Sequence, residues 1–392
     1  MNSSAAIVGI GEVPVRRDRD RSALDIAVTV AEEAIRDSGL SREEIDVVLV
    51  AASFGDKWFS TDAAFARMVD ELGLTEKALL NSQIISGGST GVAMLKMANA
   101  LITSGQASAV LCVHAEQFSN LTGQEGLDFF ATAGIERQFE GVYGMTFNAM
   151  PAFTMQRYMY ETGTTIEQIA AVSVSHRAWA ALNPNAMFRK PITVEDVLAS
   201  KVVASPNMTA LMANMLGDGG SAFVMSSYDR ALELPNDPVC VWGEGHIVNT
   251  YSYAQHRDMT RMNWSTAGER AFEAAGVKPG DIDIAELYMA YPVYYLLQLE
   301  ELGFVPRGHA GEFVLRGATM PGGELPMTTN GGATSYGHIG AGVGVATLVE
   351  SARQLMGKAG ERQVDGAEIV LKTSAGGAYS DAHVTILGKG AR

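Results

Sequence analysis

A loop of small residues opens the most informative stretch of the chain, where Ser86 stands among the glycines of the sequence ISGGSTG. A second glycine-rich loop, TTNGGATSYGHIGAG, contains His338, and the pair Gly376-Gly377 follows Ser374 near the C-terminus. Such loops present backbone N–H groups and, where a helix follows, the positive end of its dipole. This combination suits the stabilisation of negative charge that develops on a carbonyl oxygen.

Each of the two longer loops leads into an apolar segment that must hold it in place. Residues 92–102 are apolar nearly all the way round at helical spacing, which predicts a helix buried on every side. A second apolar helix is predicted over 345–356. Buried strands are predicted after the two helices, at 109–113 and 367–372.

The same order of elements occurs twice. The spacing from Gly39 to Asp46 equals that from Gly276 to Asp283, and each phrase lies between a predicted helix and a predicted strand. Two copies of helix, strand, glycine-rich loop, buried helix and strand imply an internal duplication of α/β halves. We predict an N-terminal half at 1–232, which includes an inserted loop or lid region at 117–204, and a C-terminal half at 233–392.

Composition narrows the function classes. A net charge of −15 and a pI of about 4.9 argue against nucleic acid and against an anionic membrane as partners. The N-terminus lacks the pattern of a signal peptide and no apolar run reaches the ~18 residues of a membrane span, so we expect a cytoplasmic protein. Cys112 and Cys240 lie in apolar surroundings and are expected in the core. No spacing suggests a metal site, and we expect no permanently bound cofactor.

Residues 87–91 also match G-x-S-x-G, the nucleophile pattern of α/β-hydrolases. That fold requires a single doubly wound sheet, with a triad acid and a histidine downstream of the serine. The internal duplication does not fit such a sheet, so the hydrolase hypothesis is disfavoured.

The sequence resembles the thiolase superfamily and, within it, the sterol-carrier-type and lipid-transfer-type thiolases. The resemblance covers nearly the whole chain and is carried by HRAWAALNPNAMFRKPITVEDVLAS (176–200), ELYMAYPVYYLLQLEELGF (286–304), TTNGGATSYGHIGAG (328–342) and SAGGAYSDAHVTIL (374–387). It implies an α/β thiolase-like fold with two duplicated halves in an αβαβα five-layer arrangement. It also implies a homodimer, because thiolase-like halves pair across a two-fold axis.

The departures from the family pattern bear on the chemistry. Aligning the glycines places Ile85 where a thiolase carries its nucleophilic cysteine, with Ser86 next to it. The second family cysteine, an acid/base residue, falls on Ser374. The family's Asn or His of the third loop falls on Tyr288, and only the later histidine is kept, as His338. Thioester formation needs a thiolate, so covalent thiolase chemistry is not expected here.

The loop that contains Tyr288 and the glycine-rich loop that contains His338 are similar to those of thiolase-like aldolases that shorten steroid side chains. That resemblance implies retro-aldol cleavage of a β-hydroxyacyl-CoA, a carbon–carbon lyase reaction of lipid metabolism. Tyr288 or His338 would remove the hydroxyl proton and the other would reprotonate the enolate. The positions expected to contact the coenzyme A thioester are Ser86, Ser374, Gly376 and Gly377. The aldolases carry a tyrosine where this chain has His338, and they work with a small partner that combines a zinc ribbon and an OB-fold.

Two alternatives stay open. One is an acyltransferase or condensing subunit of the acetyl-CoA acetyltransferase type that uses Ser86 or acts inside a multi-subunit complex. The other is a non-catalytic subunit that binds coenzyme A or lipid. Among further candidates, Tyr336 is placed beside the site without a role in it. Arg189 and Lys190 could meet a phosphate of coenzyme A or form a solvated pair. Expected packing or structural residues are Tyr291, Tyr294, Tyr295, His176 and Arg177.

Overall fold

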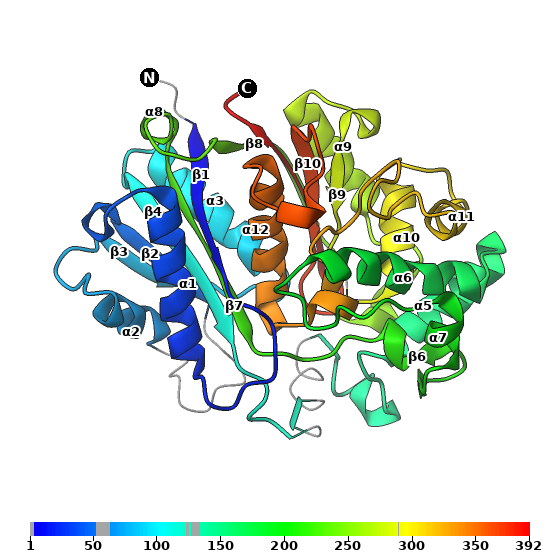
Figure 1. The fold of residues 1–392 in the computed structure, drawn as a ribbon. Coiled ribbons are helices and arrows are strands. Elements are labelled where there is room, and N and C mark those ends of the chain that lie inside the picture. Colours follow the sequence, from blue (N-terminus) through cyan, green and yellow to red (C-terminus); the bar gives the residue numbers. More distant parts are fainter. Residues whose placement is uncertain (1–3, 52–62, 123–124, 127–133, 289) are drawn as a thin grey trace.

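A computed structural model describes residues 4–51, 63–122, 125–126, 134–288 and 290–392. A mixed sheet of nine strands runs through this described part in the order β3-β2-β4-β7-β1-β8-β11-β10-β9, and β5 and β6 form a separate ribbon (Figure 1). The strands are β1 Ala5–Glu12, β2 Val47–Ala51, β3 Leu80–Gln83, β4 Ala109–Glu116, β5 Val202–Ala204, β6 Met208–Thr209, β7 Gly219–Ser227, β8 Val239–Val248, β9 Ile284–Glu286, β10 Ile369–Ser374 and β11 Asp381–Lys389.

Helices cover the outer faces of the sheet, and two more pack between the two halves. They are α1 Ala23–Ser38, α2 Ala64–Glu71, α3 Thr90–Thr103, α5 Ala149–Thr162, α6 Ile166–Leu182, α7 Val194–Ala199, α8 Tyr228–Ala231, α9 Trp264–Ala275, α10 Pro292–Glu301, α11 Ala310–Leu315 and α12 Val343–Leu355. Helix α1 begins with a capping box in which Ser22 and Asp25 exchange hydrogen bonds, a strong local start signal.

Strand pairing repeats between the two halves. In the first half β7 pairs antiparallel with both β1 and β4, and β4 pairs in parallel with β2. In the second half β11 pairs antiparallel with both β8 and β10, and β10 pairs in parallel with β9. The halves join where β1 meets β8 over the pairs Ala6–Cys240 and Ile7–Val239. The predicted duplication is therefore confirmed at the level of topology.

The repeated sequence phrase has the same structural role in both halves. Gly39 and Gly276 end α1 and α9 in the left-handed conformation, with φ of 76° and 60°. The carboxylate of Asp46 then accepts hydrogen bonds from the N–H groups of residues 108 and 109, at 2.6 and 3.2 Å. Asp283 accepts the equivalent bonds from residues 368 and 369, at 2.8 and 2.9 Å. Each aspartate thus ties one strand to the start of its neighbour.

Five layers, alternately helical and β, pack together through three apolar cores. One core joins α1 to the outer face of the first half, and a second joins α9 and α10 to the outer face of the second half. Between them, α3 and α12 pack against the inner faces of both halves in a shared core. Figure 1 shows α12 in the middle of the molecule, with α1 and α9 on opposite sides. The predicted αβαβα arrangement is confirmed.

The first middle-layer helix differs from its prediction. Helix α12 is buried along nearly its whole length, but the face of α3 that carries Ala93, Lys96, Ala100 and Thr103 is partly open to solvent. The expectation that residues 92–102 are buried on every side is wrong for this face. The physical reason is packing, because α12 is covered by strands of both halves, whereas α3 packs mainly against strands of the first half and α12.

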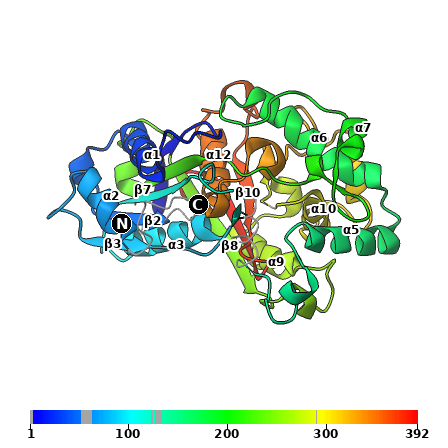
Figure 2. The ribbon, with the colours of Figure 1, turned by 90° about the horizontal axis from the view of Figure 1, so that it is seen from below.

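Residues 117–204, where we predicted an insert, hold α5, α6 and α7. Figure 2 shows these helices gathered beside α10, and α5 and α6 share the core of the second half. Among the described residues, no helix is long and apolar enough to cross a bilayer.

Candidate active site

Four loops meet at Gly88. A Cβ atom built on Gly88 would lie 2.3 Å from the carbonyl oxygen of Ala375 and 2.3 Å from Cε1 of Tyr288. The carbonyl oxygen of Gly88 lies only 2.0 Å from the Cβ position of Gly344. No other residue type leaves room for these approaches, so glycine is required at both positions. The loops before α3, after β9, before α12 and after β10 therefore form one site.

The two middle-layer helices begin side by side at this site. A Cβ atom on Gly91 would lie 2.6 Å from the carbonyl oxygen of Gly344, so the first turns of α3 and α12 are in contact. Both helices point their N-terminal, positive ends toward the same loops. Two positive helix ends therefore lie beside the same loops, the arrangement from which the sequence predicts stabilisation of negative charge on a carbonyl oxygen.

Asp381 holds two of the loops together. Its Oδ1 accepts hydrogen bonds from Ser89 Oγ at 3.0 Å and from the N–H of Gly376 at 2.5 Å. Its Oδ2 lies 3.1 Å from Nε2 of His383. Burial alone raises the pKa of Asp381, but the hydrogen bonds from His383 and Gly376 outweigh it and hold the pKa below the usual range. Asp381 is therefore an anion that fixes the loops.

Tyr288 is fixed by its backbone. Its N–H donates to Thr373 Oγ1 at 2.8 Å, and its carbonyl oxygen accepts from Nε2 of Gln298 at 3.3 Å. Gln298 also accepts from the Thr373 hydroxyl, which closes the network. Burial, and to a smaller degree the charge of Asp381, raises the pKa of Tyr288 well above its ordinary value. The phenol therefore holds its proton at neutral pH.

His338 lies in the loop before α12 and is 6% exposed. Its Nδ1 accepts the backbone N–H of Gly340 at 3.2 Å, so in the neutral ring the hydrogen is on Nε2. Burial lowers the pKa of His338 to about 4, which keeps the ring neutral at physiological pH. Tyr288 belongs to the same small apolar cluster as Tyr336 and Ile339, which flank His338 in the chain. The structure thus brings the segments of both predicted catalytic residues together.

The predicted thioester-contacting residues divide into exposed and buried positions. Ser86 and Ile85 are exposed, whereas Ser374 is fully buried as the last residue of β10. Gly376 packs against the carbonyl oxygen of Ser86, which lies 2.5 Å from its Cβ position. Gly377 follows it and is exposed. These residues therefore line two adjoining loops, with Ser374 beneath them.

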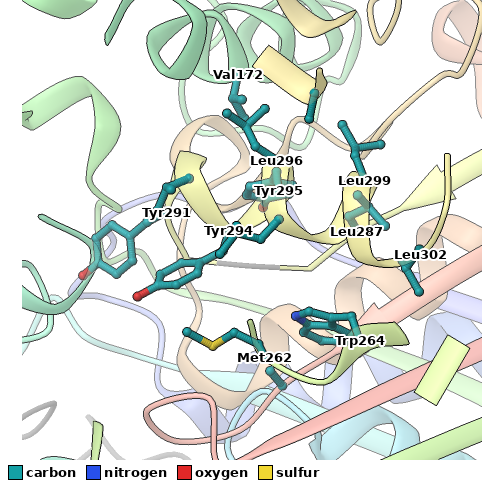
Figure 3. Close-up of a cluster of buried hydrophobic side chains, with 14 of the residues drawn as sticks. Val172, Met262, Trp264, Leu287, Tyr291, Tyr294, Tyr295, Leu296, Leu299 and Leu302 are labelled. Carbon is teal, nitrogen blue, oxygen red and sulfur yellow. The ribbon is translucent and has the colours of Figure 1, made fainter. Parts of the chain in front are cut away.

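The other tyrosines of this region have packing environments. Tyr291, Tyr294 and Tyr295 lie in the large core of the second half, together with Trp264 and Leu287 (Figure 3). Tyr336 donates from its hydroxyl to Glu12 Oε1 at 2.8 Å and is fully buried. The packing expected of these tyrosines is present, and their absence from the chemistry stays a prediction.

Residues of the segment 176–200 hold the loop before α12 in place. His176 Nδ1 lies 2.9 Å from Thr334 Oγ1, and Arg177 Nε donates to Ser335 Oγ at 3.0 Å, which agrees with their structural interpretation. Arg189 and Lys190 are exposed.

Ser89, the serine of the G-x-S-x-G match, is buried and donates to Asp381. It does not face solvent as a hydrolase nucleophile does.

Neither cysteine is at the site. Cys112 lies on β4 and Cys240 on β8, both are buried and free, and burial raises the pKa of both thiols. Within the described ranges, no group of three or more potential metal-ligating side chains is close enough to hold a metal ion.

Lys372 is the main residue that the sequence interpretation missed. It is fully buried on β10, where Nζ donates to Ser374 Oγ and, at 3.2 Å, to the carbonyl oxygen of Thr373. The available signal was one lysine inside the apolar strand sequence IVLKTS. Gln298, a lone amide in an apolar helix, and Asp381 were missed as well.

Comparisons with known proteins agree with this architecture. Residues 245–389 match the family model described as thiolase C-terminal domain-like. The chain is 32% identical to the 17-hydroxy-3-oxo-4-pregnene-20-carboxyl-CoA lyase of Mycobacterium tuberculosis, over 96% of this chain and 97% of that protein. It is 30% identical to an acetyl-CoA acetyltransferase of Methanothermobacter thermautotrophicus, over 98% of this chain and 99% of that protein.

Among solved structures, the Ltp2-ChsH2(DUF35) aldolase superposes with a TM-score of 0.84 at 28% identity, covering 99% of this chain and 98% of that chain. The resemblance to steroid side-chain aldolases is therefore confirmed. Full-length similarity to both a lyase and an acetyltransferase, together with the duplicated five-layer fold, shows that this chain belongs to the thiolase superfamily.

Proposed function

We propose that the chain is a carbon–carbon lyase that cleaves a β-hydroxyacyl-CoA by a retro-aldol reaction without a covalent intermediate. The observation that carries the proposal is a site with a proton-holding phenol, Tyr288, and no thiol. Ile85 and Ser374 occupy the two positions that resemblance assigns to the thiolase cysteines, and the cysteines of the chain lie elsewhere in the sheet. The similarity to the lyase and aldolase named above supports the same reaction class.

In this proposal His338 binds the thioester oxygen. Its Nε2–H is the donor of a neutral ring, and the N-terminal ends of α3 and α12 add positive potential on the same side. Cleavage leaves the electrons of the broken bond on the thioester α-carbon as an enolate. Hydrogen bonds that strengthen as charge develops on the oxygen lower the barrier to this step.

Tyr288 supplies the proton that ends the reaction. A phenol with a raised pKa keeps its proton until a strongly basic enolate carbon forms next to it. The same property makes Tyr288 a poor acceptor for the hydroxyl proton of the substrate, and the low pKa of His338 makes the imidazole a weak base. The sequence left both residues open for either role. The pKa directions favour Tyr288 as the acid and His338 as the oxygen ligand.

An acyltransferase is the second candidate, favoured by the 30% identity to an acetyl-CoA acetyltransferase. Ser86 would then carry the acyl group. Its side chain is exposed, and its backbone N–H donates to Thr90 Oγ1 at 3.0 Å, but no basic side chain is among its hydrogen-bond partners in the described residues. An unactivated hydroxyl is a weak nucleophile, so this candidate ranks below the lyase.

The protein copurified with its native partner should convert a branched or steroidal β-hydroxyacyl-CoA into a ketone or aldehyde and a shortened acyl-CoA. Chromatography with mass spectrometry follows both products. Intact-protein mass after incubation with acyl-CoA should stay unchanged, because the lyase forms no covalent adduct. An adduct on Ser86 would support the acyltransferase. Tight coenzyme A binding without turnover would identify a binding subunit.

The partner that we propose is a small protein with a zinc ribbon and an OB-fold, since a second component is named with the aldolase of similar structure.

We also propose a homodimer. Strand β3 is an edge of the sheet. Three apolar side chains are exposed along it: Leu79 just before the strand at 71%, Leu80 at its start at 39%, and Ile85 shortly after its end at 41%. An apolar edge strand is a template for pairing with another chain. Light scattering at micromolar concentration should give twice the mass of 41.6 kDa. A monomer at that concentration would contradict the proposal.

A further inference from the structure

The proposed reaction lacks a base, because Tyr288 holds its proton and His338 is a weak base. We propose that Ser374 and Lys372 form a proton relay, in which Ser374 Oγ takes the hydroxyl proton of the substrate and Lys372 Nζ takes the proton of Ser374. This inference rests on the proposed function and adds a second acid–base pair to it.

Strand geometry places the relay on the inner face of the second half. Val370, two residues before Lys372, packs in the middle-layer core, whereas Leu371 packs in the outer core. Side chains alternate along a strand, so Lys372 and Ser374 both point inward, toward α3 and α12. Ser374 is followed directly by the loop of Ala375, which touches Gly88. The relay therefore runs from the meeting point of the four loops into the interior.

The contact between the two side chains is direct. Lys372 Nζ is within hydrogen-bond distance of Ser374 Oγ, and both residues are fully buried. In the ammonium form Nζ donates to this oxygen. In the neutral amine its lone pair accepts the hydroxyl proton of Ser374. In the described part of the chain, no carboxylate forms an ion pair with Lys372 within 4.0 Å. The amine is therefore held by neutral oxygens, which do not require it to be charged.

The surroundings of Lys372 favour the neutral, deprotonated form of its amine. Burial lowers the pKa of Lys372 to about 7, and the charge of Glu286 partly opposes this effect. Glu286 is the cross-strand neighbour of Lys372, but burial and the nearby Glu350 raise the pKa of Glu286 well above its usual range. Charged or titratable groups that line the same face include Glu286 on β9, Asp381 and His383 on β11, Glu244 and His246 on β8, Glu350 on α12 and Lys96 on α3.

The chemistry balances without another reactant. The substrate O–H bond breaks as Ser374 gives its proton to the neutral amine of Lys372 and receives the substrate proton. The Cα–Cβ bond then breaks, Cβ becomes a carbonyl carbon, and the electron pair stays on Cα as the thioester enolate. Tyr288 gives its phenolic proton to Cα. The ammonium of Lys372 releases a proton to solvent and the phenolate of Tyr288 takes one up, so no net proton is consumed.

The test is the pH dependence of kcat/KM for cleavage. Because the neutral amine is the active form, the rate should rise with pH through an ionisation near pH 7 and level off above it. In Lys372→Met, which keeps the apolar stem, the rate above pH 8 should fall by roughly 10²-fold and this rising limb should disappear. Ser374→Ala should behave alike, and the double variant should lose no more than either single one, since the two residues act as a unit.

Two further variants assign the ionisation. Thr385→Val is the matched control, because Thr385 is the cross-strand neighbour of Lys372 and its buried hydroxyl has no hydrogen-bond partner in the described residues. It should keep the rising limb. Glu286→Gln should also keep it. Loss of the limb in Glu286→Gln and not in Lys372→Met would assign the ionisation to Glu286 and overturn the relay.

A readout independent of activity separates the relay from the proposed function. Protein labelled with ¹³C at lysine Cε should show one resonance that titrates near pH 7 and is absent from Lys372→Met. If no lysine titrates below pH 9, the relay is wrong whatever the activity. If Lys372 titrates but no β-hydroxyacyl-CoA is cleaved, the proposed function fails. Cleavage with a pH profile that Lys372→Met leaves unchanged sinks the relay alone.

Discussion

Replacing Tyr288 by phenylalanine is expected to lower retro-aldol turnover by roughly 10²–10⁴-fold, the range that a positioned acid contributes. The substitution removes one oxygen and keeps the ring, so the contacts with Gly88 and the apolar cluster remain. The backbone bonds of Tyr288 to Thr373 and Gln298 do not involve the phenol and also persist. Steady-state kinetics should show the loss in kcat, with coenzyme A affinity unchanged.

Tyr336→Phe is the matched control for this experiment. It also removes a buried tyrosine hydroxyl, but one that donates to Glu12 and not to a substrate. It should cost about 1–3 kcal/mol of stability, because the carboxylate of Glu12 loses a buried donor, and should leave turnover nearly unchanged. Equal kinetic losses in Tyr288→Phe and Tyr336→Phe would mean that the phenol of Tyr288 acts through stability alone.

The second large effect is expected at His338. In His338→Asn the amide oxygen can take the place of Nδ1 and keep the hydrogen bond from Gly340, whereas the Nε2–H is lost. Loss of a donor to a developing oxyanion should lower kcat by roughly 10²–10³-fold. Burial lowers the pKa of His338 to about 4, so the ring is already neutral above pH 6. The variant should therefore keep the wild-type pH profile between pH 6 and 9.

His338→Gln is the companion variant. Its longer side chain can place an amide N–H near the former Nε2 position, so part of the activity should return. If His338→Asn removed the neutral-pH ionisation, His338 would be the base and its role as oxygen ligand would be refuted. If both variants kept full activity, the histidine would have only a structural function.

The topology could be predicted because the same sequence phrase occurs in both halves. The phrase from Gly39 to Asp46 and its copy from Gly276 to Asp283 carry a helix stop and a strand clamp, which are local devices with strong residue preferences. Element ends were less accurate. Strand β10 was predicted to end at residue 372 but continues through Ser374, because pairing with β11 extends it.

The interior chemistry was less predictable. A lysine in a strand is usually solvent-facing, and the sequence pattern of one strand does not show that Lys372 points toward α3 and α12. That orientation depends on which face of the sheet the second middle-layer helix covers. The pKa directions of Tyr288 and His338 likewise depend on burial by loops from all over the chain, which spacing alone does not reveal.

The shared middle-layer core has a consequence for how the chain is made on the ribosome. Residues of α3 and of the inner face of the first half, such as Met94, Leu95 and Phe223, bury their side chains against α12, which is synthesised more than a hundred residues after β7. During synthesis the inner apolar face of the first half therefore stays exposed to solvent until α12 has left the ribosome. Premature release or truncation before that point leaves an aggregation-prone fragment, so the two halves, although copies of one pattern, cannot mature as independent units.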